Sequence, residues 1–196
     1  NLKKILFPLC NFTKEEVRRI AKENGISVAD KKDSQDICFI PDGNIKAFLQ
    51  RRSDKHKAGN IVDVKGNILG EHKGISYYTV GQREGLGIAK GYPAYVTKID
   101  YKKNRITIGR REDVLSSEFL IKDLYYAYKP IKKKVALKVK IRYNHKERKA
   151  ELIPALNNKI RVKFKEPQFA VTPGQAAVFY NRNKVIGGGV IDKVLG

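Results

Sequence analysis

Apolar positions from about residue 117 onward alternate with polar ones or form short apolar runs, with turn residues between them. Six segments share this pattern: 119–127, 135–143, 149–153, 159–164, 176–180 and 185–191. Short strands at such regular spacing predict a small closed barrel. In the second segment we expect the alternate apolar residues from Val135 to face the core, and Lys138, Lys140 and Arg142 to face outward.

Two hairpin patterns and a glycine-rich stretch occupy the middle of the chain. Residues 61–64 and 68–69 flank one turn, and residues 94–99 and 105–109 flank another. The stretch 81–91 between them is rich in glycine, which permits unusual backbone angles and close approach of a ligand. It could bind phosphate or be a structural loop, since it has neither Walker-type nor dinucleotide spacing. Its Arg83 is a candidate contact to phosphate, not a catalytic residue.

The N-terminal part predicts one amphipathic helix. Thr13 followed by Glu16 fits a capping box for a helix that runs to about Asn24 and stops at Gly25. Its apolar stripe requires a core that this part does not provide. The chain also begins at Asn1 and contains no methionine, so we expect it to be the tail of a longer protein. A short helix is expected over 44–51.

Charge is the strongest compositional signal. Lys and Arg number 41 against 20 Asp and Glu, for a net charge of +21. Such an excess favours a polyanionic partner, although a merely soluble surface, thermal adaptation or a biased genome also enrich lysine. Ten basic residues and one acid, Glu147, lie between Lys129 and Lys149. Tyr143 and His145 in this run add stacking and hydrogen-bonding groups, which favours RNA over a solvated face.

The cysteine and histidine content excludes several classes of protein. Cys10 and Cys38 are the two cysteines, which make no disulfide framework and no Cys-x-x-Cys redox motif. The three dispersed histidines have no metal-ligand spacing with either cysteine, so no metal is predicted. No apolar run reaches membrane-spanning length and no signal peptide opens the chain, so we expect a cytoplasmic protein without a membrane partner.

Cys38 lies in a short apolar run, 37–40, that ends at a Pro-Asp-Gly turn and reads as a strand. A cysteine among Ile and Phe is commonly a small buried hydrophobe. As a nucleophile it would need a thiolate, and the nearby lysines 31 and 32 are offset by aspartates 33 and 36. The local composition leaves both interpretations open.

Residues 34–40, Ser-Gln-Asp-Ile-Cys-Phe-Ile, resemble the second-cysteine motif of the tRNA-specific 2-thiouridylases, the MnmA/TrmU family. Other segments are similar to the same family in the same order. They are 6–9, 13–18 and 20–21 (the helical segment before that motif), 78–87 (a glycine-rich signature), and 142–143, 169–180 and 187–189 (C-terminal signatures).

This resemblance implies a sulfurtransferase that converts the wobble uridine of certain tRNAs to 2-thiouridine. ATP adenylates the uracil O2, and a persulfide on Cys38 supplies sulfur, after which Cys38 can form a disulfide with a partner cysteine. Arg142, Tyr143 and Gln175 match tRNA-contacting positions, and a persulfide donor or relay protein is a second partner. The family's Ser-Gly-Gly-Val-Asp-Ser loop and its partner cysteine are absent from the printed sequence. We therefore expect the ATP site to lie outside this chain, and the chain alone to be inactive.

The resulting expectation is a mainly β protein with some α structure. Residues 1–40 would be the end of an α/β ATP-pyrophosphatase catalytic domain, 41–115 a small α+β central domain, and 116–196 a six-stranded tRNA-binding β-barrel. A non-catalytic RNA-binding barrel, with Cys38 only filling a core, would explain the charge and the strands equally well. No role is assigned to Cys10, because the family commonly has glycine there.

Overall fold

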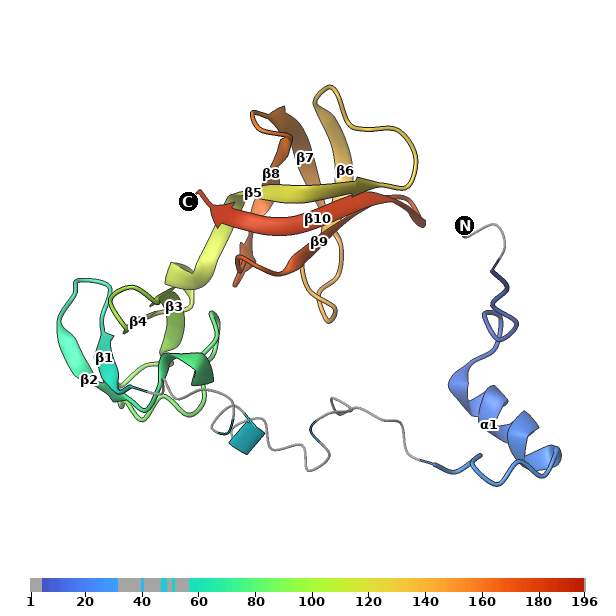
Figure 1. Cartoon of the computed structure of the whole chain (residues 1–196), viewed down its shortest axis with the longest axis horizontal. Helices are drawn as coiled ribbons and strands as arrows, with labels where there is room; N and C mark the ends of the chain where they lie inside the picture. Colours follow the sequence, from blue (N-terminus) through green and yellow to red (C-terminus); the bar gives the residue numbers. More distant parts are fainter. Residues whose placement is uncertain (1–4, 32–39, 41–46, 49–50, 52–56, 196) are drawn as a thin grey trace. The chain divides into compact units, whose positions relative to one another are not determined.

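The computed structural model describes residues 5–31, 40, 47–48, 51 and 57–195 (Figure 1). The chain divides into two compact units, residues 1–48 and 49–196, and each is described by itself. Cys38 and most of the strand predicted around it lie outside the described residues. So does most of the helix predicted over 44–51, of which residues 47, 48 and 51 are helical.

The described part of the first unit contains one helix, α1 (Lys14–Glu23). The predicted capping box is confirmed: Glu16 donates its backbone N–H to Thr13 Oγ1 (3.3 Å), and Thr13 donates its N–H to Glu16 Oε2 (2.6 Å). These bonds satisfy N–H groups that have no partner within the helix. Helix α1 buries none of its residues against the described chain, in accord with an apolar stripe that lacks its own core.

A small four-stranded sheet opens the second unit, in the order β2-β1-β4-β3. Its strands are β1 (Gly59–Val62), β2 (Ile68–His72), β3 (Tyr95–Asp100) and β4 (Arg105–Gly109). Both predicted hairpins are confirmed as antiparallel pairs. The parallel pairing of β1 with β4, which joins the hairpins into one sheet, was not predicted. Ile61, Val96 and Ile106 are fully buried between the sheet and the glycine-rich stretch, from which Leu86 also packs into this core.

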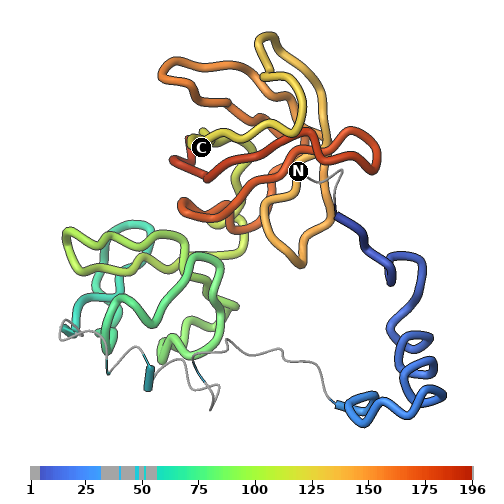
Figure 2. Tube along the Cα trace, turned by 45° about the vertical axis from the view of Figure 1, so that its right-hand side comes forward, coloured from blue at the N-terminus to red at the C-terminus, as the bar shows by residue number. Residues whose placement is uncertain are grey.

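Six strands close into a barrel in the order β10-β5-β8-β7-β6-β9 (Figures 1 and 2). They are β5 (Leu115–Tyr126), β6 (Val135–Lys140), β7 (Arg148–Ala155), β8 (Lys159–Phe169), β9 (Ala176–Asn181) and β10 (Lys184–Val194). The predicted barrel and its six strands are thus confirmed. The bounds differ most at β8, which runs to Phe169, and at β5, which begins at Leu115; β6 ends three residues earlier than predicted, at Lys140, and β10 three residues later, at Val194. Phe119, Leu152 and Phe179 are fully buried in the barrel core.

One end of the barrel, here called the mouth, is where β5, β7 and β9 begin and β6 and β8 end. Register places these ends together, because Leu115 pairs with Phe169, Val139 with Arg148, and Lys140 with Val178. The short 3-10 helix η3 (Glu112–Val114) leads from the small sheet into β5 at this end. Ala170 donates its N–H to Val114 O (3.0 Å), which ties the end of β8 to that connection. The mouth therefore faces the small sheet.

Candidate nucleic-acid interface

Arg142 lies at the mouth, two residues after the end of β6. Its Nη2 donates to Val80 O (3.1 Å) and to Thr172 Oγ1 (3.0 Å). Burial lowers the pKa of the guanidinium. The prediction that Arg142 belongs to an outward charged face is only half right: it points away from the barrel core, but its head is half-buried against the small-sheet loop. Arg142 therefore connects the loop before Gly81 to the turn after β8.

Gln175 lies in the turn before β9, beside the same end of β6. Gly174 (φ +87°) donates its N–H to Ile191 O, and Gln175 O accepts from Ile191 N–H, both at 2.8 Å. The Gln175 side chain is exposed. Since Lys140 pairs with Val178 and the strands are antiparallel, continuing the register brings Arg142 next to this turn. The structure thus gathers two of the predicted tRNA-contacting residues, which are 33 positions apart in the sequence, at one end of the barrel.

Tyr143 is the third of these residues, and its side chain is 92% exposed. Lys140 Nζ lies 5.5 Å from the centre of its ring. His145 donates its N–H to Arg142 O (3.1 Å), which closes the turn around Tyr143. An aromatic ring held at the tip of a turn and open to solvent is suited to stack on an unpaired base.

A polar cleft of about 400 Å³, here called the mouth cleft, opens beside this turn. It is lined by Arg111, Leu115, Asn144, His145, Lys146, Arg148, Glu166, Pro167, Gln168 and Phe169. The lining includes three Arg or Lys and one carboxylate. Burial, and secondarily the charge of Arg142, lower the pKa of His145, so its imidazole is neutral at pH 7. The cleft therefore carries an excess of positive charge.

Arg111 and Phe169 are the cleft residues that sequence reasoning missed. The guanidinium carbon of Arg111 lies 5.3 Å from the centre of the Phe169 ring, and that ring packs edge-on against Tyr95 (5.6 Å between centroids). Arg111 lies directly before η3 and Phe169 ends β8, so nothing in their local sequence indicates a shared site. The available signals were the Arg110-Arg111 pair directly after a predicted strand and the family-like segment 169–180, which begins at Phe169.

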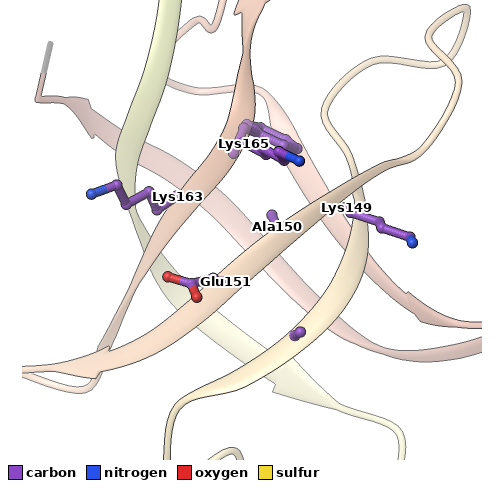
Figure 3. A pocket seen from close by; sticks show the side chains of 7 residues that line it. Lys149, Ala150, Glu151, Lys163 and Lys165 are labelled. Atoms are coloured by element: carbon purple, nitrogen blue, oxygen red, sulfur yellow. The ribbon is translucent and has the colours of Figure 1, made fainter.

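A second hollow, the wall groove, lies over β6, β7 and β8 (Figure 3). Its volume is about 320 Å³, and it is lined by Ala136, Lys149, Ala150, Glu151, Lys163, Phe164 and Lys165. Lys149 lies directly opposite Lys138 on β6. Because Ala150 pairs with Phe164, the continued register places Lys165 on the other side of Lys149. Three lysines thus lie in one cross-strand row, where like charges repel.

At the first turn of the glycine-rich stretch, the backbone groups form hydrogen bonds within the protein. Gly81 (φ +87°) donates its N–H to Val96 O (2.8 Å), and Val96 returns a bond to Gln82 O (2.9 Å). The Gln82 side chain accepts from Thr79 N–H and donates to Glu84 O. These bonds favour the structural loop over the phosphate-binding loop at residues 81–84. Arg83 is exposed and stays a predicted phosphate contact.

Two other features of the second unit do not have the character of an anion site. A cavity of about 710 Å³ between the small sheet and the barrel is lined by two lysines, two aspartates and mostly uncharged groups. His72 is buried, accepts Gly74 N–H at Nδ1 (3.2 Å) and lies 3.1 Å from Asn104 O through Nε2, as a structural histidine does.

The described residues lack two further kinds of feature. They contain no group of three or more His, Cys, Asp or Glu side chains able to hold a metal ion. No helix in this part of the chain is both long enough and apolar enough to cross a membrane.

Comparison with known protein families places three matches along the chain. Residues 1–42 match the tRNA methyl transferase HUP domain, 46–110 the tRNA methyl transferase PRC-barrel domain, and 116–191 the aminomethyltransferase beta-barrel domain. Each match is a likeness to a domain family.

Curated relatives cover nearly the whole chain. It is 50% identical over 97% of its length to the tRNA-specific 2-thiouridylase MnmA of Acetivibrio thermocellus, of which it covers 54%. It is 46% identical over 98% of its length to MnmA 1 of Caldanaerobacter subterraneus subsp. tengcongensis (53% covered), and 44% identical over 99% to MnmA 1 of Clostridium botulinum strain Okra (56% covered). The chain spans about half the length of the curated relatives it matches.

Proposed function

The chain belongs to the family of the tRNA-specific 2-thiouridylases, and we propose that it is the part of such an enzyme that carries the persulfide cysteine and binds tRNA. The observation that supports this most is the identity of 44–50% to 2-thiouridylases across almost the entire chain. The high positive charge and the gathering of exposed aromatic and basic groups at the barrel mouth support the tRNA-binding part.

Cys38 is the proposed sulfur carrier, on the strength of its motif. A persulfide ends in a soft, nucleophilic sulfur, and adenylation turns the uracil O2 into a good leaving group. The terminal sulfur forms a bond to C2 as AMP leaves with the oxygen. A partner thiolate then attacks Cys38 Sγ, which breaks the S–S bond of the persulfide, leaves a protein disulfide and releases 2-thiouridine.

Arg142, Tyr143 and Gln175 are proposed to contact tRNA from the mouth. Tyr143 offers its exposed ring for stacking, and Gln175 an exposed amide. Nη2 of Arg142 is occupied by Val80 and Thr172, so any RNA contact would use its remaining N–H groups. On this proposal Arg142 both fixes the shape of the mouth and adds charge to it.

The remaining parts of the proposal concern groups outside the chain. ATP would bind a site that this chain does not contain, and a persulfide donor or relay protein would load Cys38.

The division into a catalytic-domain end (1–40), a central domain (41–115) and a tRNA-binding barrel (116–196) remains a prediction, as does a cytoplasmic location. We expect the chain alone, given ATP and a sulfur donor, not to thiolate tRNA.

The sulfur-carrier role is tested by loading the chain from a cysteine desulfurase with labelled cysteine. Wild type and Cys10→Ser are expected to take up label that reductant releases, and Cys38→Ser to take up none. Cys10 is a suitable control because its thiol is free and exposed. Label that survives in Cys38→Ser and disappears in Cys10→Ser would contradict the assignment. If wild type takes up none, the same comparison in a protein of the relatives' full length decides it.

The alternative is an RNA-binding barrel that catalyses no reaction. It is favoured because all the candidate site residues that the structure describes lie in the second unit. The alternative predicts that Cys38→Ser in the full-length protein leaves tRNA 2-thiouridine content unchanged. The sulfurtransferase predicts that 2-thiouridine disappears while tRNA binding persists. Mass spectrometry of tRNA nucleosides separates the two.

A further inference from the structure

We propose that the mouth cleft binds a phosphodiester group of the RNA backbone through Arg111 and Arg148, while Tyr143 stacks on a base close by in the chain of the same RNA. This inference rests on the proposed tRNA-binding function, and it adds a site that is not among the residues carried over from the family resemblance. Its ligand is a single RNA phosphate, held at a fixed place on the barrel.

The charge of the cleft is the first argument. Arg111, Lys146 and Arg148 line it against one carboxylate, that of Glu166. In the part of the chain that the structure describes, no carboxylate lies within ion-pair distance of these three side chains, although seven other ion pairs form there. Cations gathered around a concave surface without counterions raise the local potential and attract an anion.

Preorganisation is the second argument. The guanidinium of Arg111 is held over the Phe169 ring, and Tyr95 packs against that ring, so the donor face of Arg111 is aimed before a ligand arrives. Arg148 is the first residue of β7 and pairs with Val139, which fixes its backbone at the mouth. Planar guanidinium groups match the geometry of phosphate oxygens and donate two parallel hydrogen bonds.

The third argument is the position of Tyr143. It is on the same turn as three of the cleft residues, Asn144, His145 and Lys146, and its ring is open to solvent. Single-stranded RNA presents bases and phosphates in alternation, and proteins bind it with aromatic platforms next to basic grooves. A stacked base on Tyr143 would leave its flanking phosphate near the cleft. The neutral imidazole of His145 can add a hydrogen bond without adding charge.

The wall groove is a weaker candidate for a fixed phosphate. Its basic side chains are all lysines, which present a point charge on a flexible stem. Its one carboxylate, Glu151, already pairs with Lys134 (2.7 Å). We assign it a diffuse attraction for RNA and no specific contact.

The experiment measures binding of an unmodified tRNA transcript to the full chain over a range of salt concentrations. The variants are Arg111→Gln and Arg148→Gln, with Arg182→Gln as the matched control. Arg182 is an exposed arginine in the β9–β10 turn, at the other end of the barrel. Each cleft variant is expected to bind roughly fivefold more weakly at about 0.1 M salt and to lower the slope of log K against log salt by about one. For the control, the loss of tRNA affinity and the change in slope are each expected to be at most about half of those in the cleft variants.

Phosphate-ethylation interference identifies the ligand directly. Ethylation of one phosphate of the tRNA should block binding by wild type. In both cleft variants, ethylation of that phosphate, and of no other, should cease to reduce binding. Matching melting temperatures establish that the variants are folded, and Arg148→Lys should recover part of the affinity. Unchanged affinity, slope and interference pattern in the cleft variants would overturn the inference. Absence of tRNA binding by wild type would instead overturn the proposed function.

Discussion

The mouth cleft and the wall groove of the barrel have the same charge and different construction. Each is lined by three Arg or Lys side chains and one Glu. The cleft is assembled from the start of β5, the end of β8 and the β6–β7 turn, and contains arginines, a histidine and an aromatic ring. The groove is built from the neighbouring strands β6, β7 and β8, and its basic side chains are all lysines. The count of charges therefore does not distinguish a site from a basic surface.

A contact holds the charged group of Arg111 in the cleft, whereas none of the groove's three lysines makes an ion pair or a side-chain hydrogen bond with the described residues. Arg142 links Val80 to Thr172, and Phe169 lies between Tyr95 and Arg111. These contacts hold the donors in place before RNA arrives, which reduces the entropy lost on binding. On the wall, long lysine side chains lose that entropy when they engage a phosphate. The following predictions test this difference, from the largest expected effect to the smallest.

Gly81→Ala should have the largest effect of these variants, a loss of folding stability at the mouth. Position 81 has φ +87°, and an added Cβ would lie 2.6 Å from the Ala170 Cβ and 3.0 Å from Phe169 Cε1. Backbone strain and overpacking together should lower the free energy of unfolding by about 3 kcal/mol. Gly87→Ala is the control, because its φ is +68° with nothing within 4 Å, so strain alone should cost about 1 kcal/mol. Urea denaturation measures both, and equal losses would mean that close packing at position 81 is unimportant.

Tyr143→Ala should weaken tRNA binding without affecting stability. The loss of one stacked base costs about 1–2 kcal/mol, so we expect roughly tenfold weaker binding. Because the ring is 92% exposed, the melting temperature should hardly change. Tyr125→Ala is the matched control: its side chain is 73% exposed and lies near the end of β5 opposite the mouth. Equal losses of affinity in the two variants would remove the distinction between the mouth and the rest of the barrel.

Lys149→Glu should stabilise the fold slightly while weakening RNA binding. The substitution replaces repulsion from Lys138 and Lys165 by attraction. Because Glu147 already pairs with Lys138 (3.0 Å), Lys165 supplies most of the gain, and the free energy of unfolding should rise by about 0.2–0.5 kcal/mol. Removal of one diffuse charge and addition of an opposite one should lower tRNA affinity only a few-fold. Lys184→Glu, at the β9–β10 turn, serves as the control for charge alone. A loss as large as that of Arg148→Gln would mean that the wall groove, too, holds a fixed phosphate.

His145→Gln should change only the pH dependence of stability. The pKa of His145 is lowered in the folded chain, chiefly by burial. As the pH falls below the ordinary value of 6.5, the unfolded chain therefore takes up a proton that the folded chain resists, and stability decreases until the lowered pKa is reached. The variant should lack this component. Unfolding free energies of wild type and variant should diverge as the pH falls from about 7 to about 5, with that of wild type decreasing more, and parallel curves would contradict the burial of His145.

Much of the fold followed from local patterns. Capping chemistry predicted α1, because Thr13 and Glu16 satisfy backbone groups within their own turn. Alternation predicted all six barrel strands and both hairpins, because a strand with one buried face must show period two. The parallel pairing of β1 with β4 escaped prediction, since neither strand carries a local mark of its partner. The extension of β8 to Phe169 escaped it because Glu166-Pro167-Gln168 breaks the apolar pattern.

The candidate site, too, was predictable only in part from local sequence patterns. The sequence by itself determined that the chain is basic, mainly β and similar to the 2-thiouridylases, and it identified Cys38, Arg142, Tyr143 and Gln175 as residues to test. Only the tertiary structure decided that Arg142 is half-buried against Val80 and that Arg111 meets Arg148 across a cleft. The physical reason is range: propensity, capping and alternation act between residues a few positions apart, whereas a cleft depends on how closed strands bring distant segments together.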